Sequence, residues 1–274
     1  MGLSYRRFEK VSAATSFLTE EAGACVVGGG TLLVRRVNEG DAAVTTYVRV
    51  CDPEMKRIDE ADGRIRLGAL VTMAQLLGHP GLQWLAPAAR IVGGPAIRSA
   101  ATVGGNLFAA SPYGDFGVAL LALGAVVTVH GAVGVEEWPL AEFFARRDSL
   151  PAGLIVTSVA FTRPEAGTFR FVKASRVKPK GAAIVSIAAV IARDAGRVGA
   201  ARIAFGAMAG TPIRASSFER ALIGEQLITA TLDRLEPHVT EGTTPPSDAI
   251  ASAWYRQAVL PVHLRRLLLP EIDG

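Results

Sequence analysis

The sequence contains too little cysteine for a cross-linked or cysteine-rich metal protein. Its 274 residues include two cysteines, Cys25 and Cys51. An iron–sulfur cluster or a cysteine-rich zinc site takes about four ligands, and a disulfide scaffold takes several pairs. We therefore expect both cysteines to be small, buried residues of a protein that works in the reducing cytoplasm.

Concentrated charge and long apolar runs are also missing. The net charge is +4 without a block of five like charges, so the charge pattern does not favour nucleic-acid binding. The longest segment free of Asp, Glu, Lys and Arg is 116–135, which approaches the roughly 20 residues of a membrane span. Glycines divide it, and we predict a buried helix over 116–124 and a strand over 125–129. The first twenty residues lack the pattern of a signal peptide.

Several common functional signatures do not occur in the chain. It has neither the G-x-G-x-x-G of a Rossmann fold nor a Walker phosphate loop, and it has no G-x-S-x-G nucleophile elbow. The four histidines are too far apart for metal-ligand spacing. They are His79, His130, His238 and His263. We predict no metal site and no catalytic residue of the chain's own.

Half of the residues are apolar and 20% are charged, which predicts a packed core. The pattern predicts three stretches: 1–52, 53–164, and a small α+β domain over 165–274. In the first, a helical opening leads to strands at 24–27 and 45–51. In the second, Asp62-Gly63 forms a turn beside an edge strand at 64–67. Further helices are expected at 70–77, 84–92, 140–146, 216–223 and 249–269, and further strands at 154–161, 169–173, 183–192 and 201–208.

The glycine run Gly28-Gly29-Gly30-Thr31 is the first candidate binding element. Glycine permits a positive φ and lets the backbone approach a ligand closely. Successive N–H groups then form an anion-binding nest, for which a pyrophosphate is a natural guest. A plain tight turn is the alternative, and this short motif alone does not exclude it.

The second candidate is a stretch of small residues from Ile97 to Asn106 that runs on to 111–115. Small side chains bury little apolar area, so such a stretch is better suited to wrapping a ligand than to filling a core. Thr102 and Asn106 could bond phosphate or sugar oxygens, and Asp115 could accept bonds from hydroxyl groups. Asp115 also fits the N-cap of the helix that follows, and the two roles are compatible.

With the apolar run 120–126, the two glycine loops make the sequence recognisable. It resembles the FAD-binding (medium) subunit of molybdenum hydroxylases, the xanthine dehydrogenase and carbon monoxide dehydrogenase family. The resemblance is most specific over 93–125. The other segments that carry it are 28–31, 65–72, 171–173 with Arg176, and 201–214.

The resemblance implies the two-part FAD-binding fold of the vanillyl-alcohol oxidase type over 1–164, with subdomains 1–52 and 53–164, followed by the C-terminal α+β domain. It implies that the two glycine loops hold the pyrophosphate, that Asp115 bonds ribityl or ribose hydroxyls, and that a cation at Lys173 tunes the flavin. The cofactor-binding residues it implies are Val27, Gly28, Gly29, Gly30, Thr31, Leu32, Ala101, Thr102, Gly104, Gly105, Asn106, Ser111, Asp115, Ile155, Val156 and Lys173. A solvated strand lysine is the alternative for Lys173.

Two positions depart from the family pattern. Leu32 directly follows Thr31, where a small or acidic residue is usual. The segment Lys178-Pro179-Lys180-Gly181 replaces a usual acidic residue with positive charge. The first departure bears on flavin binding, and the second bears on the electron acceptor or the partner surface.

The function implied is electron transfer within a hetero-oligomer. A large molybdopterin subunit would act on the organic substrate, a small subunit would carry 2Fe–2S clusters, and FAD on this chain would pass electrons to NAD, oxygen or another acceptor. Two alternatives stay open: a stand-alone FAD-dependent oxidase or reductase, and an assembly subunit that has lost FAD.

Overall fold

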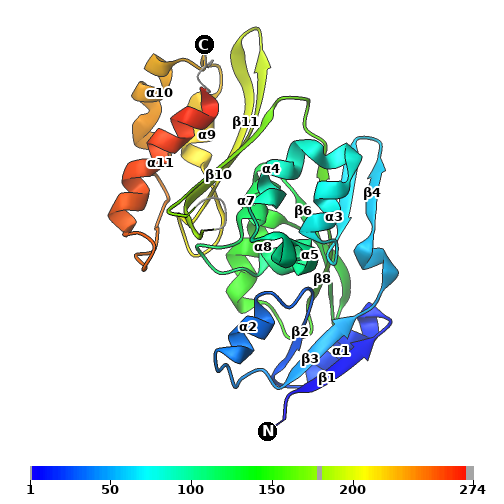
Figure 1. The fold of residues 1–274 in the computed structure, drawn as a ribbon. Coiled ribbons are helices and arrows are strands. Elements are labelled where there is room, and N and C mark those ends of the chain that lie inside the picture. The colour runs from blue at the N-terminus through cyan, green and yellow to red at the C-terminus, as the bar shows by residue number, and fades with distance from the viewer. Residues whose placement is uncertain (1, 178–180, 270–274) are drawn as a thin grey trace. The chain divides into compact units, whose positions relative to one another are not determined.

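The computed structural model describes residues 2–177 and 181–269 of the chain (Figure 1). The described residues form two compact units that are not continuous in sequence. Unit 1 comprises residues 2–83, 94–109 and 125–162, and unit 2 comprises 84–93, 110–124 and 163–269. Helices and strands are mixed throughout, which confirms the predicted α+β class.

The N-terminal part of unit 1 is a parallel three-stranded sheet in the order β1-β3-β2. Its elements are β1 (Ser4–Phe8), α1 (Val11–Glu20), β2 (Ala24–Val26), α2 (Leu33–Asn38) and β3 (Thr46–Val50). In β3, Thr46, Val48 and Val50 are buried, whereas the residues between them are half-buried. The predicted helical opening is wrong for 4–8, because these residues pair in parallel with β3 over their whole length.

The rest of unit 1 is built on an antiparallel sheet in the order β4-β5-β8-β6-β7. The strands are β4 (Ile58–Ala61), β5 (Arg64–Gly68), β6 (Val126–Gly131), β7 (Gly134–Pro139) and β8 (Ile155–Thr162). The predicted turn at Asp62-Gly63 joins β4 to β5 and is confirmed. The prediction that 64–67 form an edge strand is wrong, because β5 pairs with β4 on one side and with β8 on the other.

Short helices connect these strands, and two of them begin at threonines that face each other. The helices are η1 (Pro53–Lys56), α3 (Met73–Gly78), α5 (Pro95–Ala100), α6 (Val103–Leu107), α8 (Leu140–Arg146) and η3 (Arg147–Ser149). Thr72 caps α3 and Thr102 caps α6 through their hydroxyl groups. The two caps form an isolated antiparallel bridge, so the start of α6 is held beside the start of α3.

Unit 2 is an antiparallel sheet with helices on both faces. Its strands, in the order β12-β11-β10-β9, are β9 (Phe169–Ser175), β10 (Ala183–Asp194), β11 (Arg197–Gly206) and β12 (Ile213–Arg214). Its helices are α4 (Ala86–Arg90), α7 (Asp115–Ala122), α9 (Ser216–Leu222), α10 (Thr229–Leu235), η4 (Glu236–Val239) and α11 (Ala253–Leu268), and η2 (Pro80–Leu85) spans the junction with unit 1. Helix α10 is not among the helices predicted from the sequence.

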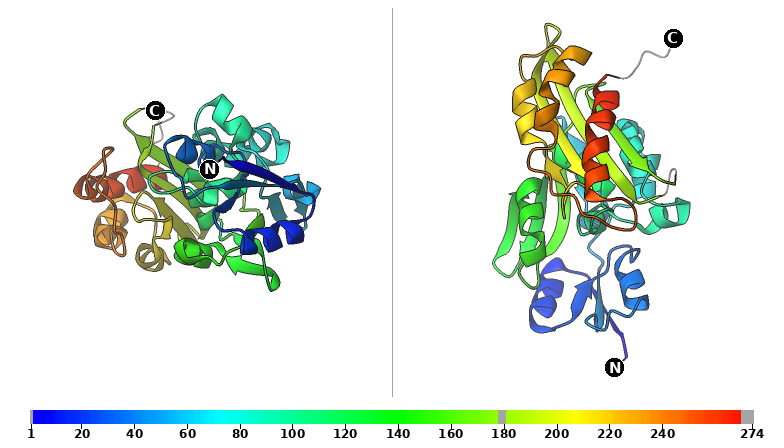
Figure 2. Two further views of the ribbon diagram at one scale, coloured as in Figure 1. Left: turned by 90° about the horizontal axis from the view of Figure 1, so that it is seen from below. Right: turned by 90° about the vertical axis from the view of Figure 1, so that its left-hand side faces the viewer.

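The alternating side chains of β10 divide the core of unit 2. Val185, Ile187 and Ala189 pack with residues of α9, α10 and α11, and α11 lies across the strands in the right-hand view of Figure 2. The opposite face of β10 and β11 carries α7, whose eight residues are all buried. This burial confirms the predicted buried helix and accounts for the lack of charged residues over 116–122. None of the described helices has the length and apolar character needed to cross a membrane.

A fully buried arginine ties the loop before α11 to the sheet. Arg256 has no exposed surface. Its guanidinium donates to both carboxylate oxygens of Asp248, at 2.9 and 2.8 Å, and to the carbonyls of Ala183 and Ile184 at 2.8 and 2.6 Å. Five donors in a rigid fork suit this arrangement, which fastens the polar loop 241–252 onto the start of β10.

Candidate functional site

The first glycine loop is a run of backbone donors without acceptors. It links β2 to α2, and Gly30 has a φ of +74°. None of the N–H groups of residues 28–33 donates to an acceptor in the described parts of the chain, although residues 28–31 are only half-buried. Buried amides are normally paired within the protein, whereas unpaired amides of half-buried residues are available to water or to a ligand. Six consecutive free amides around a left-handed glycine therefore have the character of an anion-binding nest.

An arginine on the neighbouring strand holds the opposite edge of this loop. Arg49, in β3, donates from Nη1 to the carbonyl oxygens of Val27 and Gly28. In a planar trans peptide, the C=O group and the N–H group of the next residue point in opposite directions. A carbonyl that is bound on one side therefore leaves the following N–H pointing to the other side. Arg49 is not among the site residues predicted from the sequence. The available signal was an arginine in the middle of the β-branched strand TYVRV, at a half-buried position.

The second glycine loop lies directly against the first. A Cβ added to Gly28 would stand 2.8 Å from the Thr102 hydroxyl, and a Cβ added to Gly29 would stand 1.6 Å from the carbonyl oxygen of Ala100. Neither position has room for a side chain. The two segments predicted from separate parts of the sequence are therefore brought together within unit 1, and Gly28 and Gly29 are required by this close contact.

Most amides of the second loop are already engaged. Val103 and Gly104 donate their N–H groups to the carbonyls of Val71 and Ala69, both at 2.8 Å, and the Gly105 N–H donates to the Thr102 hydroxyl at 3.1 Å. Thr102 is buried and its oxygen acts as a helix cap. The second loop thus presents a close-packed backbone surface with few free amides, in contrast to residues 28–33 of the first loop.

The other candidate residues of unit 1 occupy varied positions. Val27 donates its N–H to Val48 and continues β2, and Leu32 is 41% exposed just before α2. Ala101 is buried and Asn106 is half-buried in α6. The remaining two, Ile155 and Val156, open β8 with exposed fractions of 2% and 6%. Their packing against a flavin ring stays a prediction.

In unit 2, Asp115 and Lys173 form a buried ion pair. Lys173 Nζ lies 2.7 Å from Asp115 Oδ2, and the two side chains are 6% and 7% exposed. The alternative of a solvated lysine is therefore wrong. Asp115 is not the N-cap of α7 either: Gly114 takes that position with a φ of +91°, and Asp115 is the first helical residue. A carboxylate there still favours the helix dipole.

The lysine of the ion pair belongs to a row of register partners across three strands. Lys173, Ser186 and Gly206 are register partners on β9, β10 and β11. A Cβ on Gly206 would come within 2.3 Å of Ser186 Oγ and 2.6 Å of Val118 Cγ2. Glycine at this position therefore allows the first turn of α7 to approach the sheet closely enough for Asp115 to reach Lys173.

Some buried polar atoms of unit 2 have no partner among the described residues. Asp115 Oδ1, Ser186 Oγ and the Ser111 hydroxyl are buried and make no hydrogen bond in the described structure. Burial raises the pKa of the Asp115 carboxyl, the charge of Lys173 opposes this, and the nearby Ser186 hydroxyl acts in the same direction as Lys173 without reaching hydrogen-bond geometry. An unpaired buried oxygen is costly, so Asp115 Oδ1 and Ser111 Oγ have the character of acceptors for a ligand hydroxyl.

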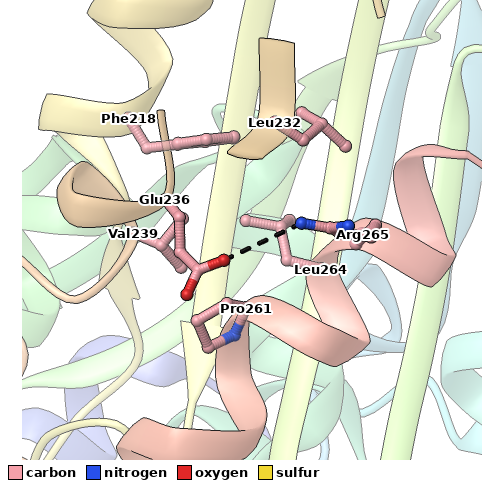
Figure 3. Close-up of a pocket in the computed structure, with 7 residues that line it drawn as sticks. All are labelled: Phe218, Leu232, Glu236, Val239, Pro261, Leu264 and Arg265. Atoms are coloured by element: carbon pink, nitrogen blue, oxygen red, sulfur yellow. Dashed lines mark ion pairs between the residues drawn. The ribbon is translucent and has the colours of Figure 1, made fainter. Parts of the chain in front are cut away.

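A small hollow elsewhere in unit 2 does not suit a flavin. It lies between α10, η4 and α11, and its mouth carries the Glu236–Arg265 ion pair at 3.8 Å (Figure 3). It encloses about 220 Å³ including the open mouth, whereas small-molecule pockets begin at roughly 300 Å³.

Two positions were expected to depart from the family pattern. The first, Leu32, is the exposed residue just before α2. The second lies at Lys178, Pro179 and Lys180, which are outside the described residues.

Comparison with known proteins gives concordant matches over most of the chain. A family model described as the FAD-binding domain in molybdopterin dehydrogenase matches residues 1–164, and one described as the CO dehydrogenase flavoprotein C-terminal domain matches 170–270. The nicotinate dehydrogenase FAD-subunit of Eubacterium barkeri is 29% identical over 262 residues, covering 90% of this chain and 88% of the relative. The carbon monoxide dehydrogenase medium chain of Afipia carboxidovorans is 25% identical and covers 96% and 94%.

Solved structures share the fold. A chain of the carbon monoxide dehydrogenase from Hydrogenophaga pseudoflava superposes with a TM-score of 0.92 at 23% identity, covering 98% of this chain and 96% of that one. A chain of quinoline 2-oxidoreductase from Pseudomonas putida gives a TM-score of 0.88 at 24% identity with the same coverage. The fold predicted from the sequence is therefore confirmed.

Proposed function

Because the chain belongs to the family of FAD-binding subunits of molybdopterin dehydrogenases, we propose that it is the electron-transfer subunit of a molybdenum hydroxylase. It is an oxidoreductase subunit that binds FAD. In the proposed complex, a large molybdopterin subunit acts on the organic substrate, and a small subunit carries the 2Fe–2S clusters that deliver electrons. FAD on this chain accepts them and releases them to NAD, oxygen or another acceptor.

The observation that carries the proposal is the run of free amides at residues 28–33. A pyrophosphate has several acceptor oxygens and two negative charges, and a nest of unpaired N–H groups complements both. Because this loop packs closely against residues 100–102, positions 28 and 29 cannot carry a side chain. The residues present in unit 1 therefore suit the pyrophosphate of FAD.

The buried acceptors in unit 2 support the same cofactor. Asp115 Oδ1 and Ser111 Oγ lack partners in the described structure, and ribityl and ribose hydroxyls would supply the missing donors. We propose these two residues as contacts for sugar hydroxyls, and Ile155, Val156 and Lys173 as residues near the flavin ring. When FAD is bound, Lys173 would hold positive charge in a water-poor environment.

The proposal that partner subunits carry the iron–sulfur clusters rests on the metal ligands of this chain. It has two cysteines, and an iron–sulfur cluster takes about four cysteine ligands. Among the described residues, no three His, Cys, Asp or Glu side chains are grouped as a metal site would require. Clusters that feed the FAD would then belong to a partner. Location of the complex in the cytoplasm stays a prediction.

Two alternative functions predict different behaviour of the purified chain. A stand-alone FAD-dependent oxidase or reductase would turn over an organic substrate without partner subunits. An assembly subunit that has lost FAD would bind partners but not the cofactor, and Leu32 would be the first residue to examine. Unpaired amides beside Leu32 favour cofactor binding over loss.

The first experiment is an absorption spectrum of the purified chain before and after heat release of any bound chromophore. Flavin bands, with FAD rather than FMN in the released fraction, support the proposal. Reduction of that flavin only by a co-purified iron–sulfur partner supports the electron-transfer role, whereas direct reduction by an organic substrate favours the stand-alone enzyme. A colourless chain that does not bind added FAD overturns the proposal in favour of the assembly subunit.

A further inference from the structure

One face of the three-stranded sheet carries two neighbouring arginines in very different surroundings. Arg7 and Arg49 are register partners on β1 and β3. The Arg7 side chain is 62% exposed and pairs with Glu9 at 3.0 Å. Arg49 is half-buried, and its guanidinium donates to backbone carbonyls of the first glycine loop instead of a carboxylate.

The two carbonyls that Arg49 binds belong to the residue before the free amides, Val27, and to the first residue of that run, Gly28. Gly28 has no Cβ and Gly30 has a left-handed φ of +74°, so the loop has little intrinsic preference for one conformation. A charge-assisted hydrogen bond is among the stronger polar interactions available to hold it. In the described part of the chain, no other side chain donates to the carbonyls of Val27 or Gly28.

We infer that Arg49 is a positioning residue for the pyrophosphate loop: it fixes the carbonyls of Val27 and Gly28 on one side so that the amides of residues 28–33 are presented together on the other. The inference rests on the proposed function, since the loop's ligand is the FAD pyrophosphate. Arg49 acts through the loop, because its hydrogen bonds in the described structure go to loop carbonyls. Loss of the anchor frees the loop to turn its amides apart, which lowers affinity without removing any contact atom.

The experiment compares Arg49→Met with the matched control Arg7→Met. Each removes one positive charge from adjacent positions of the same sheet face. Apoprotein is prepared from each variant, and FAD affinity is measured by fluorescence quenching. Amide hydrogen exchange of the peptide that covers residues 28–33 is followed with and without FAD. We expect Arg49→Met to weaken FAD binding by about tenfold or more, because bonds made by charged groups contribute on that order. We expect Arg7→Met to leave it within about twofold of wild type.

Exchange at residues 28–33 separates positioning from charge attraction. In the wild type, saturating FAD should protect these amides. In Arg49→Met, protection should remain incomplete even when FAD is saturating, whereas a variant that lost only long-range attraction would regain full protection at high FAD concentration. Equal weakening by Arg7→Met and Arg49→Met, or full protection in Arg49→Met, overturns the inference.

Arg49→Lys keeps the result decisive if Arg49→Met does not fold. Both bonds come from Nη1. Lysine retains the charge, but its nitrogen stands one bond nearer the backbone than Nη1 and does not reach both carbonyls, so we expect weakened FAD binding and incomplete protection in Arg49→Lys as well. Wild-type affinity and protection in Arg49→Lys contradict a positioning role. Failure of the wild-type protein to bind FAD is a separate outcome, and it refutes the proposed function itself.

Discussion

Replacing Lys173 by methionine tests the buried ion pair most directly. The side chain keeps its length and loses its charge. Lys173 Nζ and Asp115 Oδ2 are 2.7 Å apart, and the side chains are 6% and 7% exposed. The substitution leaves a buried carboxylate whose other oxygen, Oδ1, already has no partner.

The expected loss of stability is large because water cannot reach the remaining charge. Breaking a buried pair by removing one partner typically costs about 3–5 kcal/mol, and no reduction for solvent screening applies at this degree of burial. Lys173→Met together with Asp115→Asn removes both charges, and we expect it to recover most of that loss. The exposed lysine Lys56 provides the control, for which Lys56→Met should change the free energy of unfolding by less than about 0.5 kcal/mol.

The penalty should depend on pH in a defined direction. Burial raises the folded-state pKa of Asp115 above its ordinary 3.8, and Lys173 counteracts this rise. In Lys173→Met the pKa therefore rises further. A carboxyl whose folded pKa is raised contributes stability that is present below its unfolded pKa and lost as the pH rises through its folded pKa. The deficit of Lys173→Met should thus be greatest near neutral pH and shrink as the pH falls towards 3.8.

Urea unfolding of the apoprotein at several pH values measures these quantities. The wild type, both single variants, the double variant and Lys56→Met are compared at equal ionic strength. A deficit below about 1 kcal/mol in Lys173→Met, the size expected of an exposed pair, would refute the reasoning. So would a double variant less stable than Lys173→Met, because the unpaired charge would then not be the cause.

The same variants examine the proposed role beside the flavin. If Lys173 contributes positive charge at the ring, Lys173→Met lowers the flavin reduction potential in FAD-loaded protein, because the cation favours the reduced, more negative cofactor. Lys56→Met should leave the potential unchanged. An unchanged potential in Lys173→Met, with FAD still bound, means that the charge serves Asp115 alone.

Three further substitutions test the close packing at two glycines and the buried hydrogen bonds of Arg256. Gly29→Ala places a Cβ 1.6 Å from the carbonyl oxygen of Ala100, so we expect loss of FAD binding in an absorption titration, and bound FAD at wild-type affinity would contradict the loop contact. Gly206→Ala brings a Cβ within 2.3 Å of Ser186 Oγ; overpacking costs about 1–3 kcal/mol, measurable by urea unfolding, and an unchanged midpoint would argue against the close approach of α7. Arg256→Met leaves buried carbonyls unpaired and should cost about 3 kcal/mol or more, with a loss below 1 kcal/mol as the contrary result.

The sequence predicted well wherever a structural role depends on a residue's own conformational range or apolar character. The glycine run at 28–30 needs backbone freedom, and the buried helix at 116–124 consists almost entirely of apolar residues, so both could be recognised locally. The strand at 4–8 was missed because its short polar segment is extended only through pairing with β3. Helix α10 was missed because its two turns depend on packing against neighbouring elements.

The way in which the parts of the candidate site are arranged depends on contacts between residues that are far apart in the sequence. The sequence by itself determined which two loops are rich in glycine, that the chain has too few cysteines for an iron–sulfur cluster, and which family it resembles. Only the tertiary structure decided that these loops touch, that Lys173 pairs with Asp115, and that Arg49 anchors the first loop. Strand register and helix docking set these pairings, and a register shift of one residue would turn each side chain to the opposite face of its sheet.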